Sequence, residues 1–342
     1  MRQRIPLLTA SLIATALAVL PACGSPPALR GAPAASAPAA SAPAASAPAA
    51  SAPAASATGP GRDPGEFSRQ VDVGDGRGLW LSCKGSGGPT VVLESGLHDS
   101  SDTWTLTDTR PPVPKAPAVF PGVAAFARVC TYDRPGTIRY TDPPALTTRS
   151  TRQSGTRSLG AMADDLDRLL TAAHVPGPYL LVGHSFGGMI TRLYAQRHPR
   201  KTAGLVFVDA FGTDMEPYFG ARWPAYLKLL DNPGTPFDAD PAFEKVDVDG
   251  AIGAVRAAKP LPKVPMAVLS KTRPFAAPAG STKALLAPLE RAWPEVQRTL
   301  VELGEQTPHL LATGSDHYVQ LHDPDLTISA IRLVAGRIRF GR

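Results

Sequence analysis

The sequence contains few cysteines, few charged residues and few aromatic residues. Of its 342 residues, 3 are cysteines, 19% are charged and 6% are aromatic. It has no Cys-x-x-Cys pair and no cluster of histidines, so nothing in it indicates a metal site. Lys and Arg form no run and do not alternate with aromatic residues, so the net charge of +6 does not indicate nucleic-acid binding. We interpret this charge as a solvated surface.

The N-terminal segment lacks a hydrophobic run long enough to cross a bilayer. Residues 5–20 are mostly apolar, but about 20 apolar residues are needed to span a membrane. The run follows the basic start Met1-Arg2-Gln3-Arg4, a combination typical of an export signal over residues 1–22. It ends in Leu20-Pro21-Ala22-Cys23, which resembles a bacterial lipobox.

The lipobox resemblance implies cleavage before Cys23 and attachment of lipid to Cys23. Acyl chains would then hold the protein at the cell membrane or the outer membrane, with the folded domain outside the cytoplasm. Plain secretion without lipid is the alternative.

Residues 23–65 are rich in Ala, Pro and Ser. Within them, residues 32–56 are five tandem copies of Ala-Pro-Ala-Ala-Ser. Regular prolines prevent a continuous helix, and no bulky apolar side chain is available to build a core. We therefore expect a disordered, semi-extended tether that leads to a folded domain over residues 66–342.

From residue 66 onward, strand-like and helix-like segments alternate, beginning with a hairpin over residues 70–83. Strand-like segments also cover residues 89–94, 129–133, 179–182, 205–209, 264–269 and 309–312, and helical patterns cover residues 158–173, 189–198, 284–303 and 325–337. Pro288 and Pro294 should break or kink the third of these helices. This alternation predicts a mostly parallel sheet with helices on both faces and an antiparallel edge.

The alternation stops between residues 211 and 263. This segment is rich in aromatic residues and prolines, and it is long for a connection between two strands. We interpret it as a cap insertion over a functional site. A surface insertion whose aromatic residues pack on the main core is the alternative.

The segment Gly183-His184-Ser185-Phe186-Gly187 follows a buried apolar strand and leads into a helix. A serine on such a sharp turn is exposed above the sheet, and the flanking glycines let neighbouring segments approach closely. The pattern predicts a nucleophile elbow with Ser185 as the nucleophile. A serine hydroxyl needs a histidine to take its proton and an acid to orient that histidine.

His317 is the best candidate for the catalytic base, because it lies in a loop between the last short strand and the final helix. The other histidines are His98, His174, His184, His198, His309 and His322. His184 lies inside the elbow and should point elsewhere, and His98 follows the turn after the third strand. The remaining four lie at helix ends, a strand start or a polar loop, where histidines are usually structural or solvated.

Several motifs together make the chain, from residue 67 to its end, resemble an α/β-hydrolase of the esterase-like serine-hydrolase type. They are Leu93-Glu94-Ser95-Gly96-Leu97-His98 with Trp104 downstream, Tyr132-Asp133-Arg134-Pro135-Gly136, the elbow, residues 205–209, and Asp316-His317-Tyr318 before Asp323-Pro324. The resemblance implies the α/β-hydrolase fold, with a mostly parallel eight-stranded sheet, helices on both faces and a cap insertion at about 211–263. It implies no cofactor and no metal.

In such hydrolases the catalytic residues follow the chain order Ser, acid, His. The usual position of the acid, after the strand at 264–269, holds no carboxylate here. Other members carry the acid one strand earlier, where Asp209 ends a buried strand, and Asp214 is the alternative. Asp316 is too close in sequence to His317 to reach its far nitrogen easily. The resemblance places the oxyanion hole at the backbone N–H groups of Phe186 and Leu97.

Cys83 and Cys130 fall in strand-like segments that are neighbours in this fold. A cross-strand disulfide is therefore possible, and two buried free thiols are the alternative.

We expect a monomeric carboxylesterase that forms an acyl-enzyme on Ser185. The aromatic residues of the predicted cap favour a small-molecule ester with a hydrophobic acyl or aryl group. The alternatives are an amidase or exopeptidase of the same fold and a lipoprotein that binds a ligand without turnover.

Overall fold

The computed structural model describes residues 65–109, 114–277 and 281–341. The predicted export signal, Cys23 and the repeats at 32–56 lie outside these residues. Contacts within the chain divide it after Ser56, and all the residues described belong to the second unit. Among the residues described, no helix is long and apolar enough to cross a membrane.

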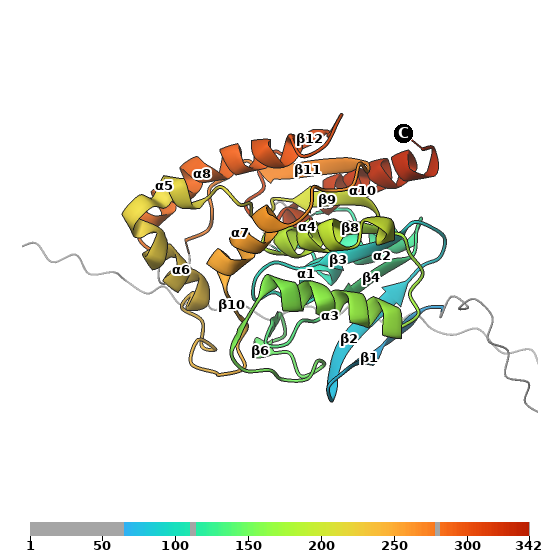
Figure 1. Cartoon of the computed structure of the whole chain (residues 1–342), viewed down its shortest axis with the longest axis horizontal. Helices are drawn as coiled ribbons and strands as arrows, with labels where there is room; N and C mark the ends of the chain where they lie inside the picture. The colour runs from blue at the N-terminus through green and yellow to red at the C-terminus, as the bar shows by residue number, and fades with distance from the viewer. Residues whose placement is uncertain (1–64, 110–113, 278–280, 342) are drawn as a thin grey trace, which may run out of the picture. The chain divides into compact units, whose positions relative to one another are not determined.

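Eight strands form the central sheet in the order β1-β2-β4-β3-β8-β9-β11-β12 (Figure 1). They are β1 (Phe67–Gly74), β2 (Arg77–Lys84), β3 (Thr90–Glu94), β4 (Val129–Tyr132), β8 (Tyr179–His184), β9 (Thr202–Val208), β11 (Met266–Lys271) and β12 (His309–Ala312). β1 and β2 run antiparallel to each other, as do β2 and β4, and the remaining pairs are parallel. The predicted mostly parallel sheet with an antiparallel edge is confirmed.

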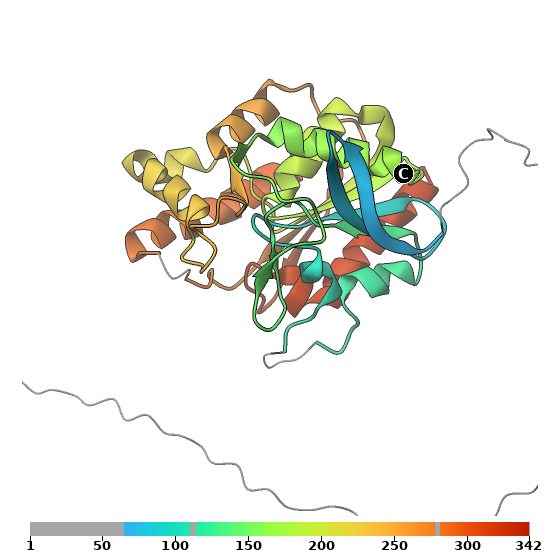
Figure 2. The same cartoon turned by 90° about the horizontal axis from the view of Figure 1, so that it is seen from below.

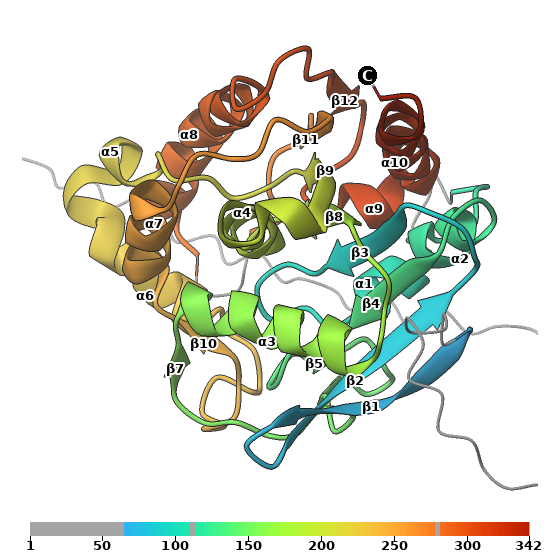
Figure 3. The same ribbon diagram turned by 45° about the vertical axis from the view of Figure 1, so that its right-hand side comes forward.

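Helices cover both faces of this sheet (Figure 3). One face carries α3 (Leu159–Ala172), α4 (Gly187–Arg197), α7 (Val248–Ala257) and α8 (Lys283–Val301), and the other carries α2 (Val119–Ala124) and α10 (Pro324–Arg339). In α3 the Ser158 side chain accepts a hydrogen bond from the Ala161 N–H and caps the helix, and an apolar stripe that includes Met162 and Leu166 is buried.

The helix α8 is continuous through Pro288 and Pro294, so the predicted break does not occur, and the predicted kink stays a prediction. Each proline removes one backbone hydrogen bond from the helix interior. The loss is tolerated because one face of the helix, including Leu289, Trp293 and Val296, is buried in the core. Packing of this face outweighs the local preference of proline.

A disulfide joins the antiparallel edge to the parallel part of the sheet. Cys83 on β2 lies directly opposite Cys130 on β4, and their sulfurs are bonded. The bridge closes a loop with a sequence separation of 47 residues.

Residues 211–263 contain α5 (Glu216–Phe219), α6 (Trp223–Asp231), β10 (Lys245–Val246) and α7. In Figure 2 these elements, coloured yellow to orange, gather at the left of the sheet. β10 pairs with β7 (Thr156–Arg157), so the part of the segment around residues 245–246 is hydrogen-bonded to the main fold. The rings of Phe219 and Tyr226 are stacked, both contact the ring of Trp223, and all three belong to the main core.

Candidate active site

Ser185 lies on the sharp turn between β8 and α4. Its φ is +50°, a left-handed conformation that is strained for a residue with a side chain. Two backbone hydrogen bonds hold it there: the Ser185 N–H donates to the Val208 carbonyl (3.2 Å), and the Phe211 N–H donates to the Ser185 carbonyl (2.9 Å). The last residue of β9 and the loop that follows it therefore hold the elbow in this conformation.

The glycines of the elbow are required by close packing. A Cβ on Gly183 would lie 2.6 Å from the Gly187 carbonyl oxygen, and a Cβ on Gly187 would lie 2.5 Å from the Glu94 carbonyl oxygen. A side chain at Gly183 would therefore collide with the first turn of α4, and a side chain at Gly187 would collide with the end of β3. The spacing noted in the sequence thus has a steric cause.

His317 and Asp209 form a hydrogen-bonded pair beside the elbow. The imidazole Nδ1 lies 2.7 Å from Asp209 Oδ2, and Asp209 Oδ1 accepts a hydrogen bond from the Lys271 N–H at 3.0 Å. Asp209 is fully buried directly after β9, so both of its oxygens are fixed. A carboxylate at Nδ1 sets the tautomer in which Nε2 can accept a proton.

Asp214 does not contact His317. Its carboxylate pairs with Arg256 at 3.2 Å, and both side chains are about half exposed. Of the two acids considered from the sequence, the structure brings only Asp209 to the histidine.

The histidines nearest the elbow are engaged in other contacts. Nε2 of the buried His184 bonds to the His317 carbonyl oxygen at 2.9 Å, and burial lowers the pKa of His184 well below its usual value. His98 Nε2 bonds to the Leu230 carbonyl oxygen at 2.7 Å, and burial also lowers its pKa. Both rings are therefore neutral near pH 7 and act as packing elements around the site.

The turn after β3 lies directly against the elbow. A Cβ on Gly96 would be only 3.2 Å from the Ser185 Cβ. Within the described residues, neither the Leu97 N–H nor the Phe186 N–H donates a hydrogen bond to another group of the protein. Phe186 is also the N-cap of α4, whose dipole favours negative charge at this position. Two free backbone donors therefore belong to residues that line the same cavity as Ser185, where an oxyanion hole would be.

Ser185 and His317 line one cavity of about 190 Å³. Leu97 and Phe186 line it too, and Tyr226, Leu229 and Leu230 of α6 supply part of its apolar wall. The first half of the 211–263 segment thus borders the cavity, while Phe219 and Trp223 pack in the core.

The alpha/beta hydrolase fold family matches residues 89–246 of the sequence. This chain has the α/β-hydrolase fold. The uncharacterized protein YqjL of Bacillus subtilis (strain 168) is 25% identical over 254 residues, which cover 72% of this chain and 84% of YqjL. Two solved structures share the fold. One is a thermophilic esterase from Thermogutta terrifontis, which is 18% identical in sequence, with a TM-score of 0.51 and an alignment that covers 80% of this chain and 98% of the esterase. The other is a hydrolase from Pseudomonas aeruginosa PA01, which is 16% identical, with a TM-score of 0.51 and an alignment that covers 79% of this chain and 98% of the hydrolase.

Two aromatic side chains around His317 were not found from the sequence. The ring of Phe275 lies 4.8 Å from that of His317, and the ring of Trp293 lies 5.3 Å away at an interplanar angle of 86°. Both line the cavity and confine the imidazole on its apolar side. They come from a loop and from α8, and no motif marks either position.

Asp99 is a second carboxyl group on the cavity wall that the sequence reasoning missed. Its Oδ1 accepts hydrogen bonds from the hydroxyls of Tyr140 (2.6 Å) and Tyr318 (3.4 Å). Burial raises the pKa of Asp99 to about 6, despite the opposing effects of the Tyr140 hydrogen bond and the charge of Arg134. Asp99 lies two residues after Leu97. This closeness to the predicted oxyanion turn is the feature of the sequence that could have marked Asp99 as a site residue.

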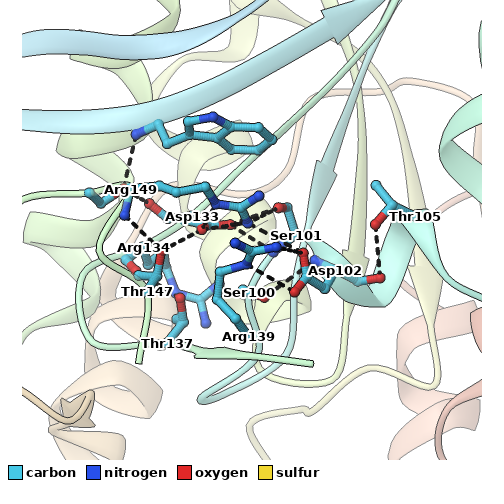
Figure 4. Close-up of polar contacts among 12 residues, drawn as sticks. Ser100, Ser101, Asp102, Thr105, Asp133, Arg134, Thr137, Arg139, Thr147 and Arg149 are labelled. Carbon is cyan, nitrogen blue, oxygen red and sulfur yellow. Dashed lines mark hydrogen bonds and ion pairs between the residues drawn. The ribbon is translucent and has the colours of Figure 1, made fainter. Parts of the chain in front are cut away.

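The segment that follows this turn is anchored by buried polar groups (Figure 4). Asp133 Oδ1 accepts hydrogen bonds from the N–H (3.0 Å) and the hydroxyl (2.7 Å) of Ser101. Asp133 Oδ2 accepts from Thr147 (2.6 Å) and Arg149 (2.7 Å). The loop between β3 and α1 (Asp102–Thr105) is thus held by the residues after β4. No group of three or more potential metal ligands occurs in the part of the chain described here.

Proposed function

We propose that this α/β-hydrolase is a serine hydrolase that cleaves carboxylic esters through an acyl-enzyme on Ser185. The observation that carries the proposal is the hydrogen bond between His317 Nδ1 and Asp209, beside a strained serine on the same cavity wall. A protein that only bound a ligand would not need all three groups in this arrangement.

In the first half of the reaction, Ser185 Oγ attacks the acyl carbonyl carbon and its proton passes to His317 Nε2. Asp209 stabilises the resulting imidazolium. The carbonyl oxygen becomes negative in the tetrahedral intermediate, and the N–H groups of Leu97 and Phe186 bind it. The intermediate then collapses, the bond to the alcohol oxygen breaks, and His317 returns the proton to the leaving alkoxide.

In the second half, water takes the place of the alcohol. His317 removes a proton from the water as its oxygen attacks the acyl carbon. Collapse of the second intermediate breaks the bond to Ser185 Oγ, which regains its proton from His317. The products are a carboxylic acid and the free enzyme.

The cavity supports a preference for apolar groups of modest size. Its volume is about 190 Å³, and leucines and phenylalanines supply much of its wall. An uncharged acyl or aryl group is compatible with this surface, whereas a strongly charged group would lose its hydration against a mostly apolar wall.

Hydrolysis of a matched set of nitrophenyl esters and nitroanilides by the purified protein tests the proposal, with Ser185→Ala as the control. We expect ester turnover that depends on Ser185 and exceeds anilide turnover. Faster anilide hydrolysis would support the amidase alternative. No turnover of either set by folded protein would support a non-catalytic binding role.

We further propose that lipid on Cys23 holds the protein at a bacterial membrane, with residues 23–65 as a tether. The support is the sequence alone: the basic start, the apolar run and the lipobox-like end. Cys23→Ser should move the protein from the membrane fraction to the soluble fraction of expressing cells. Unchanged membrane association would contradict lipid anchoring.

A further inference from the structure

Arg134 holds the turn that carries one of the two free backbone donors. It follows β4, its side chain is 2% exposed, and it donates hydrogen bonds to the carbonyls of Ser95 (2.9 Å) and Gly96 (2.6 Å). The Gly96 carbonyl and the Leu97 N–H belong to one planar trans peptide unit, so they point in opposite directions. Fixing that carbonyl on Arg134 therefore fixes the direction of the Leu97 N–H.

Two buried carboxylates in turn fix the guanidinium of Arg134. Glu94 Oε1 lies 2.6 Å from Nη1, and Glu244 accepts from Nε (2.7 Å) and Nη2 (3.0 Å). Glu244 Oε2 also accepts a hydrogen bond from the His98 N–H at 2.7 Å. Glu244 thus holds the turn in two ways, through Arg134 and directly at the residue after Leu97.

The electrostatics of this group favour a single rigid geometry. Burial alone would raise the pKa of Glu244, but attraction and hydrogen bonding to Arg134 hold its pKa below the usual range. An ionised carboxylate facing a planar guanidinium forms directional, paired hydrogen bonds. Removing Arg134 would leave two buried carboxylates without their counterion, whereas removing Glu244 would leave Arg134 paired only with Glu94.

Glu244 belongs to the same chain segment that borders the cavity. It directly precedes β10, and the neighbouring Phe243 stacks on the His98 ring with centroids 4.3 Å apart. His98 Nε2 also bonds to the Leu230 carbonyl oxygen on α6 at 2.7 Å. Residues 230–244 therefore contact the turn through the backbone of His98 and through its side chain.

We propose that Arg134 and Glu244 are positioning residues that aim the Leu97 N–H at the oxygen on which negative charge develops. The 211–263 segment then completes the oxyanion hole as well as bordering the cavity. This inference rests on the proposed ester hydrolysis, because it concerns the transition state of that reaction. Neither residue touches the substrate.

Glu244→Gln is the sharpest test, because it keeps the shape of the side chain. Glutamine has only one oxygen, so its NH₂ group must face a donor: Arg134 Nε in one orientation, and both Arg134 Nη2 and the His98 N–H in the other. A misplaced transition-state donor lowers kcat more than it raises KM. We expect kcat for a nitrophenyl ester to fall about 10- to 100-fold and KM to change less than about twofold, with a parallel loss of affinity for a boronic acid that mimics the tetrahedral intermediate.

Asp165→Asn is the matched control. Asp165 is a buried carboxylate that pairs with Arg77 and Arg157 at 2.7 Å and has no hydrogen bond to residues 95–98. It should lose stability without losing kcat or boronic acid affinity. Hydrogen exchange measured by mass spectrometry should rise in the peptide containing residues 95–98 for Glu244→Gln and stay unchanged for Asp165→Asn.

Arg134→Lys gives a second variant in case Glu244→Gln does not fold. Lysine keeps the charge but lacks the fork that reaches two carbonyls and two carboxylates together. If a folded variant of Glu244 or Arg134 keeps the wild-type kcat, the wild-type affinity for the boronic acid and the wild-type hydrogen exchange at residues 95–98, this inference is wrong. The proposed function would not be affected by that result. Absence of Ser185-dependent turnover in the wild-type protein would overturn the proposed function and, with it, this inference.

Discussion

His317 Nδ1 lies 2.7 Å from Asp209 Oδ2, although 108 residues separate the two in sequence. The sheet explains the contact. Asp209 follows β9, His317 follows β12, and only β11 lies between these two parallel strands. Parallel strands end at the same edge of a sheet, so the loops that follow them meet above it. The pair is therefore a consequence of the topology.

Asp209→Asn should lower ester turnover by about 10²- to 10⁴-fold, because asparagine cannot stabilise the imidazolium and favours the wrong tautomer of His317. The variant should fold, since an amide oxygen can still accept the hydrogen bond from the Lys271 N–H. Steady-state kinetics on a nitrophenyl ester give the measurement. Asp214→Asn is the control, because Asp214 pairs with Arg256 at the surface, and its kcat should equal that of the wild type. The reverse outcome would assign the acid role to Asp214.

Asp99 should make the free energy of unfolding depend on pH. Its pKa is raised to about 6 in the folded protein, so there it keeps a proton that the unfolded chain loses near pH 4. This contribution to stability is present below about pH 4 and is lost as the pH rises toward and through about 6. The Asp99→Asn variant lacks it. Relative to the wild type, the variant should therefore gain on the order of 3 kcal/mol of unfolding free energy between about pH 4 and 7.

Urea unfolding of the wild type and of Asp99→Asn across this pH range measures the difference. Groups that influence Asp99 include Tyr140, Arg134, His317 and Glu244, all of which both proteins keep. Stability curves that stay parallel with pH would show that Asp99 titrates at its ordinary value.

The disulfide between Cys83 and Cys130 should stabilise the domain mainly by restricting the unfolded chain. For a loop of this length the entropic effect is about 4 kcal/mol. The double variant Cys83→Ala/Cys130→Ala should therefore unfold at lower urea concentration, and a reductant should destabilise the wild type but leave the variant unchanged. Equal stability of the two proteins under oxidising conditions would contradict this assignment.

Local sequence patterns predicted the parts of the site that depend on local geometry. The elbow glycines mark Ser185 because a tight turn excludes side chains at fixed spacing. His317 could be chosen because it lies between the last strand and the last helix. Assigning Asp209 as the acid also required the chain order and the position of the acid in similar hydrolases. The sequence alone did not exclude Asp214 as the acid.

Other features of the site depend on contacts between distant segments. Glu244 stands alone in an irregular stretch, and only the fold brings it to Arg134 and His98. Phe275 contacts His317 from a loop, and Trp293 contacts it from α8. The two prolines of α8 predicted a break or a kink in this helix, so its continuity could not be foreseen from the sequence. Asp99 gains its raised pKa from burial, which no sequence motif reports.

Covalent labelling with a fluorophosphonate tests whether Ser185 is the nucleophile, because the reagent reacts with a serine activated by a neighbouring base. We predict one phosphonyl group per molecule in the intact mass, located on the peptide that contains Ser185. Labelling should disappear in Ser185→Ala and fall strongly in His317→Ala. A folded wild-type protein that stays unlabelled, or that carries the label on another residue, would contradict the assignment of Ser185 as the nucleophile.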